Sequence, residues 1–240
     1  MSFVLGNVSR ILVNERAVSA TVAGWTATHT RAVSEVTTVI ESGARFVPGL
    51  MSGSLSLRGP QDSVDQTLHN EIKDAIGVDN SLLVSVFPDG TDIGKYAVTV
   101  LGDPSEFSVD ASVTDAVGYV MTAQADESVD MGFIVHALTA ETADGNGASI
   151  DRGVGSATTG GGVAVMHTTA FAGFTGNVVK IQHSTDNAVW ADLVTFTNVT
   201  AISAERKFLA RGTTINRYVR AVTDVTGSGS TTFLVALAPR

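Results

Sequence analysis

Apolar and polar residues alternate with a period of two along much of the chain, which is the pattern of strands with one buried face. The alternation is present in residues 18–22 and is clearest in residues 54–58, where we expect Leu55 and Leu57 to be buried. The β-branched run at 35–40 predicts another strand. Gly59-Pro60 predicts the end of the strand at 54–58. These segments predict a sheet in the first quarter of the chain.

One segment, residues 64–76, has the period of an amphipathic helix instead. Its apolar face consists of Val64, Leu68, Ile72, Ala75 and Ile76. Ser63 and Gln66 match a capping box at its start, and Gly77 predicts its end. We expect this helix to pack its apolar face on a sheet.

The strand pattern resumes after the helix. Residues 82–87 and 95–101 predict a hairpin, because Pro88-Asp89-Gly90 supplies turn residues between them. The next predicted strand alternates polar residues with Phe107, Val109, Ala111 and Val113, which we expect to form its buried face. Residues 119–125 and 131–137 predict two more strands.

A Gly-rich stretch at 144–162 predicts a linker. Beyond it the sequence predicts six short strands, at 163–171, 178–183, 189–197, 206–211, 215–223 and 231–237. Short strands separated by turns are typical of a small β-sandwich. We therefore expect a mainly β protein with two domains, residues 1–155 and 156–240.

Composition and charge add to this picture. The 240 residues include no cysteine, which excludes disulfides and thiolate metal sites. Residues 1–155 hold 20 acidic and 8 basic residues (−12), whereas residues 156–240 hold 4 and 7 (+3). Such an asymmetry suggests two units in different surroundings, although an ordinary acidic domain would also explain it. No apolar run is long enough to span a bilayer, and the N-terminus lacks signal-peptide features, so we expect synthesis in a cytoplasm.

Searching the sequence for chemistry yields no candidate enzyme site. The five histidines show no ligand-like spacing, and Asp144-Gly145-Asn146 resembles a calcium loop only at its start, since Ser149 replaces the required glycine. No phosphate-binding loop or nucleophile elbow occurs. We expect no catalytic residues, no metal and no cofactor.

Residues 44–59 read ARFVPGLMSGSLSLRG, a turn of aromatic-Val-Pro-Gly-Leu type that leads into a Gly-Ser-Leu-Ser-Leu strand. With the helix and strands that follow in order, residues 10–140 resemble the major tail (tail tube) proteins of long-tailed bacteriophages. The resemblance rests on the ordered set rather than on any single motif.

This resemblance implies a β-sandwich or partly closed barrel flanked by one helix. It implies that six copies form a ring, that rings stack into a tube in the virion tail, and that DNA passes through during ejection without specific binding. The tape measure, tail terminator and distal tail proteins would be partners. A conduit should repel its polyanionic cargo, which the acidic N-terminal part fits. As a loop contacting the next ring we consider Phe46, Pro48, Gly49, Leu50 and Met51, with a plain surface loop as the alternative.

The C-terminal part is similar to immunoglobulin-like or discoidin-like sandwich modules, in the segments KIQHSTDNAVW (180–190) and NRYVR (216–220). The resemblance implies either core positions or glycan contacts for Trp190, Arg217 and Tyr218. It also implies a decoration that projects from the tube. Alternatives for the whole chain are a distal tail or baseplate ring subunit, a capsid decoration protein, or a carbohydrate-binding protein.

Overall fold

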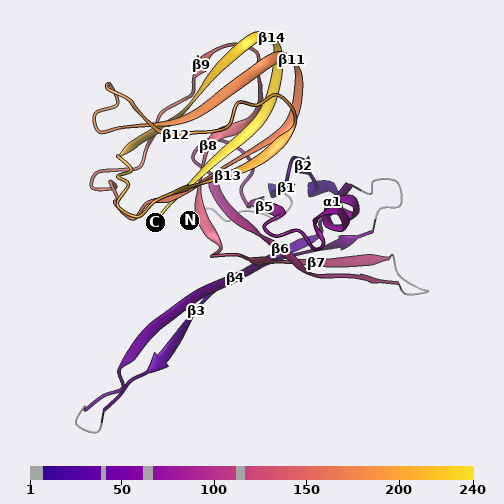
Figure 1. Cartoon of the computed structure of the whole chain (residues 1–240), viewed down its shortest axis with the longest axis vertical. Helices are drawn as coiled ribbons and strands as arrows, with labels where there is room; N and C mark the ends of the chain where they lie inside the picture. The colour runs from indigo at the N-terminus through magenta and orange to yellow at the C-terminus, as the bar shows by residue number, and fades with distance from the viewer. Residues whose placement is uncertain (1–7, 39–41, 62–66, 112–116) are drawn as a thin grey trace. The chain divides into compact units, whose positions relative to one another are not determined.

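The computed structural model describes residues 8–38, 42–61, 67–111 and 117–240 (Figure 1). Strands make up 63% of the chain and helices 5%, which confirms the mainly β class. The predicted capping box at Ser63 and Gln66 lies outside the described residues, as do Val64 and Val113.

The chain forms two compact units. Unit 1 comprises Met1–Ala20, Leu83–Thr99 and Asp130–Arg240, and unit 2 comprises Thr21–Leu82 and Val100–Val129. This division differs from a boundary after residue 155. The reason is strand pairing, because the C-terminal strand of the chain pairs with the strand that begins at Asp130. Residues 130–155 and 156–240 therefore share one unit.

Unit 1 is built on an antiparallel sheet with the order β12-β11-β14-β8-β6-β5-β1-β2. Its strands are β1 (Arg10–Val13), β2 (Arg16–Ala17), β5 (Leu82–Phe87), the start of β6 (Tyr96–Asp110), β8 (Asp130–Glu141), β9 (Gly145–Asn146), β10 (Ile150–Asp151), β11 (Gly162–Ser184), β12 (Ala191–Thr195), β13 (Ser203–Leu209) and β14 (Tyr218–Pro239). The predicted hairpin at 82–101 is confirmed as β5 and β6, and Gly90 in its turn has a φ of 86°.

Two long strands, β11 and β14, pair along their whole length, from Gly162 opposite Pro239 to Ser184 opposite Tyr218. The prediction of six short strands was wrong in number, because each long strand unites two of them. Gly173 and Gly227 have φ values of 81° and 93°, and the register shifts between residues 168 and 176. These bulges bend the strands without ending them.

The core of unit 1 draws on both halves of the long strands. Ala164 and Met166, from the first half of β11, belong to the same buried cluster as Val179 and Ile181 from its second half. The bent pair thus encloses its own core. The predicted linker at 144–162 is not a free tether, because β9 and β10 within it pair with β14.

Unit 2 contains β3 (Gly24–Glu35), β4 (Phe46–Pro60), β7 (Gly118–Ala125) and the rest of β6, in the order β3-β4-β7-β6, with the helix α1 (Thr67–Ala75). Leu55 and Leu57 are fully buried, as predicted. Leu68, Ile72 and Ala75 of the helix are buried too, and Gly77 ends it with a φ of 80°.

Four local predictions were wrong. Residues 18–22 form no strand, because Ser19–Thr21 is a 3-10 turn. Ile76 is 64% exposed because it follows the last helical residue, and Val109 is 50% exposed near the end of β6. The strand predicted at 35–40 ends at Glu35 within the described residues.

Candidate assembly surface

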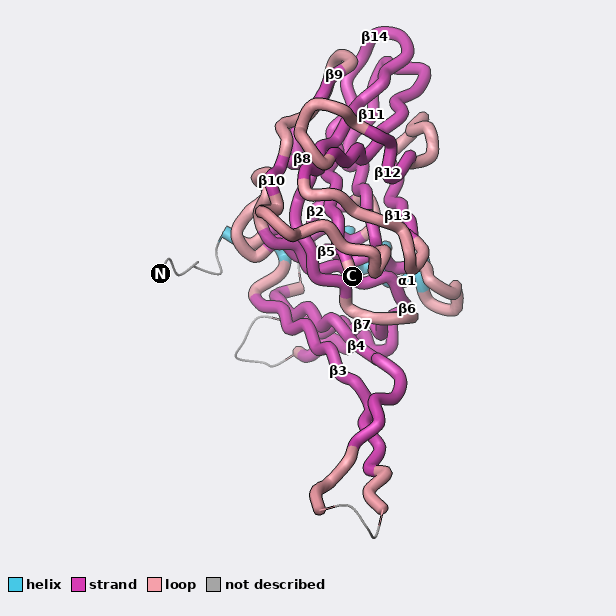
Figure 2. Tube along the Cα trace, turned by 90° about the vertical axis from the view of Figure 1, so that its left-hand side faces the viewer, coloured by secondary structure: helices cyan, strands magenta, loops and turns pink. Residues whose placement is uncertain are grey.

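The most exposed part of unit 2 is a two-stranded ribbon. Residues 54–58 of β4 pair with both β3 and β7, and residues 59–60 pair with β7 alone, whereas residues 46–53 pair with β3 alone. We call residues 29–38 and 42–53 the arm. Phe46 lies eight positions before Ser54, so the arm extends about 26 Å beyond the β7-paired part at about 3.3 Å per residue. Figures 1 and 2 show β3 and β4 running side by side along this ribbon.

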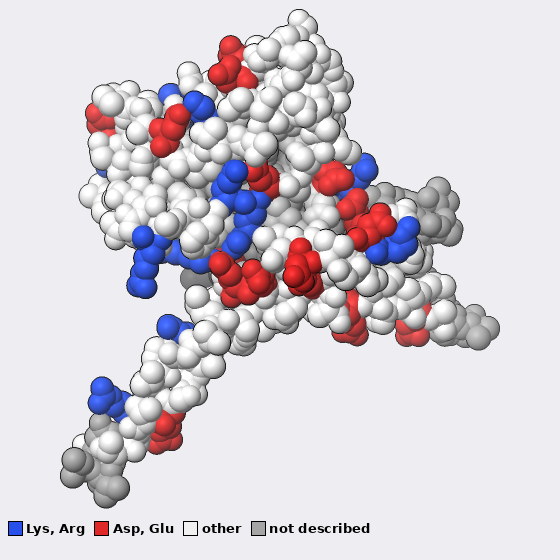
Figure 3. Space-filling model, viewed as in Figure 1, with Lys and Arg blue, Asp and Glu red and all other residues white. Residues whose placement is uncertain are grey.

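The arm exposes apolar side chains. The exposed fractions are 87% for Leu50, 64% for Val33, 57% for Phe46, 47% for Val47 and 46% for Met51. Most of the arm surface in Figure 3 is uncharged. Exposed apolar surface often marks interaction sites on soluble proteins. All five residues suggested as an inter-ring loop lie here, but in strand β4 and not in a loop.

The chain does not reverse at Pro48-Gly49, as the sequence suggested. Pro48 pairs with Val33 inside the ribbon, and a bulge between Arg31 and Val33 accommodates the proline. Proline cannot donate to a ladder, so it is found at edges and bulges. The exposed Val33 of the arm was missed, because a β-branched residue in a strand gives no sign of which face remains uncovered.

The base of the arm, at Gly53, is in close contact with neighbouring strands and side chains. The Gln124 side-chain amide donates a 2.7 Å hydrogen bond to the Gly53 carbonyl oxygen. A Cβ atom on Gly53 would lie 2.6 Å from Val129 Cγ2 and 2.8 Å from the Thr28 carbonyl oxygen. Only glycine fits this approach, so the position where the arm leaves the sheet is fixed by backbone contact.

The outer edge of β3 carries no ladder partner among the described residues, because β3 pairs with β4 alone. Its 12 residues therefore offer a row of backbone donors and acceptors on the side away from β4. Natural proteins cover or blunt such edges unless the edge is used for association.

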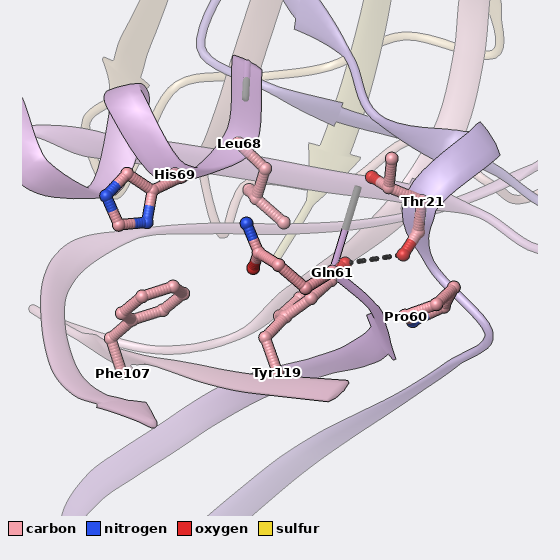
Figure 4. A pocket seen from close by; sticks show the side chains of 7 residues that line it. All are labelled: Thr21, Pro60, Gln61, Leu68, His69, Phe107 and Tyr119. Carbon is pink, nitrogen blue, oxygen red and sulfur yellow. Dashed lines mark hydrogen bonds between the residues drawn. The ribbon is translucent and has the colours of Figure 1, made fainter. Parts of the chain in front are cut away.

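A small cavity lies under α1 in unit 2 (Figure 4). His69 packs edge-on against Phe107 with ring centroids 5.5 Å apart, and the Tyr119 hydroxyl donates a 2.9 Å hydrogen bond to the Thr21 carbonyl oxygen. The cavity is about 10 Å³, the lower limit for a single water molecule. This space is a packing feature and not a ligand site.

In unit 1, Trp190 is half-buried beside β12, and the Arg220 guanidinium stacks 4.2 Å from its ring centroid. Arg220 also donates two hydrogen bonds to Gln182 Oε1, at 3.0 and 2.8 Å, and the Gln182 amide donates one of 2.8 Å to Asp192. Lys180 donates to the other oxygen of Asp192 at 2.9 Å. The result is a polar ladder across three strands, with the tryptophan against its arginine end.

Arg217 and Tyr218 do not join this ladder by any described contact. The Arg217 guanidinium lies 4.8 Å from the Tyr218 ring centroid and donates two hydrogen bonds to Asp151. These bonds, with one from the Gly153 amide, lower the pKa of the Asp151 carboxyl to about 2. Arg220 was not predicted as the partner of Trp190. Its position opposite Gln182 follows from the register between β11 and β14, which the sequence does not show.

The described residues contain no group of three or more histidines and carboxylates that could hold a metal ion. A Ser–His pair with hydrogen-bond geometry, Ser85 and His167, is completely buried. Substrate could not reach it. Within the described part of the chain, no helix has the length and hydropathy needed to cross a bilayer.

Charge also differs between the two compact units. Unit 2 holds 13 acidic and 4 basic residues, a net charge of −9, whereas unit 1 holds 11 of each and is neutral. The net charge of the whole chain therefore resides in the unit that carries the arm.

No protein-family model matches the sequence, and no curated protein matches it. Among solved structures, a chain of the virion of a native gene transfer agent particle is 14% identical, with 50% of this chain and 94% of that chain covered at a TM-score of 0.40. A chain of an extracellular contractile injection system, the PVC sheath-tube complex in its extended state, is 16% identical, with 54% and 90% covered at a TM-score of 0.44. The SPP1 Dit protein, described as a hub adsorption apparatus in phages that infect Gram-positive hosts, is 7% identical, with 96% and 98% covered at 0.38. All three TM-scores are below 0.5.

Proposed function

We propose that this chain is a non-enzymatic structural subunit of a phage tail, and that copies of it form rings, six to a ring, which stack into the tail tube. The arm is the observation that carries the proposal. An isolated two-stranded ribbon is marginally stable in water, and this one exposes Leu50, Phe46 and Val33 over about 26 Å. Contact with other copies would cover these side chains and stabilise the ribbon.

Two further features support assembly. The outer edge of β3, which has no partner strand in the described part of the chain, is 12 residues long and can extend a sheet from one copy to the next. The acidic unit suits the wall of a DNA conduit, since fixed cations would contact phosphates and slow sliding. In this proposal the acidic residues of unit 2 line the lumen.

The remaining contacts would be with other tail components. A tape measure protein would occupy the lumen before DNA, and tail terminator and distal tail proteins would bind the two ends of the tube. The protein would reside in the virion after synthesis in the host cytoplasm.

Electron microscopy of the purified full chain, over a range of concentration and salt, tests the proposal. Long tubes or stacked rings are the expected result. Single rings that never stack would indicate a distal tail or baseplate role instead. Monomers at all concentrations would overturn the proposal, and glycan binding by those monomers would favour a carbohydrate-binding protein. A ring structure with a neutral or basic inner wall would overturn the placement of unit 2.

A further inference from the structure

A second surface feature of unit 2 lies at the other end of the arm's own strand. It is a mostly apolar hollow of about 330 Å³, lined by residues that include Arg58, Gly59, Ser108, Asp110, Tyr119 and Val120. Arg58 and Ser108 are both register partners of Val120, so the three side chains share one face of the sheet. Leu57 and Met121, on the opposite face, are fully buried. The hollow therefore opens on the face opposite the buried core of the unit.

The arm and the hollow are separated along a single strand. Phe46 and Arg58 are both in β4, twelve positions apart, which corresponds to about 40 Å. A copy cannot fold its own arm into its own hollow without breaking that strand. Each copy thus offers an apolar projection at one end of β4 and an apolar recess at the other.

The two surfaces also match in charge. Arg31, Val33 and Glu35 alternate along β3, so the arm presents a cation and an anion on either side of an exposed valine. The hollow presents the same three types in Arg58, Val120 and Asp110. In a bound arm, Arg31 can therefore pair with Asp110 and Glu35 with Arg58. Val33 then contacts Val120.

We infer that the hollow between β4, β6 and β7 is the receptor for the arm of a second copy of this chain. This inference rests on the proposed assembly and names its contact between successive rings. A projection that fits a recess elsewhere on the molecule makes a heterologous contact, which propagates as an open stack when its rotation does not close into a ring. Stacking follows, and the axial repeat equals the axial component of the arm-to-hollow distance, which is at most about 40 Å.

Photo-cross-linking tests the contact directly. A benzophenone amino acid replaces Phe46 in the full chain, ¹⁵N-labelled and unlabelled chains are mixed and assembled, and mixed-isotope cross-links are mapped by mass spectrometry. The expected cross-links join the arm of one copy to residues 58–60, 108–110 or 118–120 of another. Assembly with cross-links that map elsewhere would overturn the inference and leave the proposed function intact. If the unmodified chain never assembles, both fail.

Two variants of the hollow give an independent readout. Val120→Asp places a charge in the hollow, and Ser108→Trp fills it from an exposed position. We expect each to raise the concentration needed for stacking at least tenfold while single rings persist. Val154→Asp, at a valine 89% exposed in unit 1, is the matched control and should stack normally. If Val120→Asp does not fold, Ser108→Trp decides, and normal stacking of a folded Ser108→Trp chain contradicts the inference.

Discussion

The hydroxyl of Ser85 on β5 and the imidazole Nε2 of His167 on β11 lie 2.7 Å apart, both fully buried in unit 1. Nδ1 of the same ring contacts the Asn14 carbonyl oxygen, which can only accept. Nδ1 therefore carries the proton, and Nε2 accepts the Ser85 hydroxyl hydrogen. Asn14 itself has a φ of 49° and accepts the Leu83 amide through its side chain. One buried histidine thus ties β11 to the N-terminal strands.

Acidification should destabilise unit 1 through His167. Burial lowers the pKa of this histidine from 6.5 to about 4, so the folded protein holds it neutral while the unfolded chain protonates it below pH 6.5. The free energy of unfolding should therefore be unaffected above pH 6.5 and fall as the pH drops to 4, by about 3 kcal/mol in total. Urea unfolding at pH 7 and at pH 4.5 measures this difference.

His167→Gln removes the titration and should flatten most of that pH dependence, although it lowers stability at pH 7. His29→Gln, at an exposed histidine, is the matched control and should keep the wild-type pH profile. An unchanged profile in His167→Gln would show that another group is responsible.

A chain that ends at residue 155 should fail to fold cooperatively. It lacks β11 and β14, and thus most of the cluster around Met166, Ile181 and Phe233, as well as the strand that pairs with β8. The free energy lost with this much buried apolar surface exceeds the usual free energy of unfolding of a domain. Thermal unfolding followed by circular dichroism, against the full chain, is the measurement. A sharp transition in the short chain would instead favour residues 156–240 as an independent decoration domain.

Leu50→Ser should impair assembly and leave the free chain intact. Because Leu50 is 87% exposed, the free energy of unfolding of the monomer should change by less than about 0.5 kcal/mol. Burial of a leucine contributes about 1.5–3 kcal/mol, so the assembly concentration should rise about tenfold or more. Sedimentation measures how much of the protein is assembled and how much is free chain. Val154→Ser, at 89% exposure, is the control, and equal assembly of the two variants would exclude the arm as a contact.

Trp190 and Arg220 should be energetically coupled. Their 4.2 Å stacking predicts a coupling of about 0.5–1 kcal/mol in a double-mutant cycle of Trp190→Ala and Arg220→Gln, measured by chemical unfolding. Additive effects would mean that the stacking contributes nothing. Val189→Ala, at a residue next to Trp190 that is 76% exposed, should have little effect. A glycan array probed with wild type and Trp190→Ala tests the alternative role of this residue as a sugar contact.

The local pattern of the sequence was sufficient for the class of fold and for several elements. Alternation placed Leu55 and Leu57 in the core, because a pleated strand sends every second side chain to the same face. Helical spacing identified α1, and Gly77 and Gly90 marked an end and a turn by their tolerance of positive φ. The sequence also located the exposed apolar segment at 46–51.

Long-range pairing decided the rest. Whether Gly173 and Gly227 end a strand or bend it depends on a partner strand about 50 residues away, so local residues could not predict the long β11 and β14. The same pairing assigned residues 156–240 to unit 1 and concentrated the charge of −9 in unit 2. The arm became a ribbon only because β7 stops pairing at Ser54, and that register is a property of three strands together. Composition and periodicity thus determined what the elements are, whereas the tertiary structure alone decided which surfaces they leave uncovered.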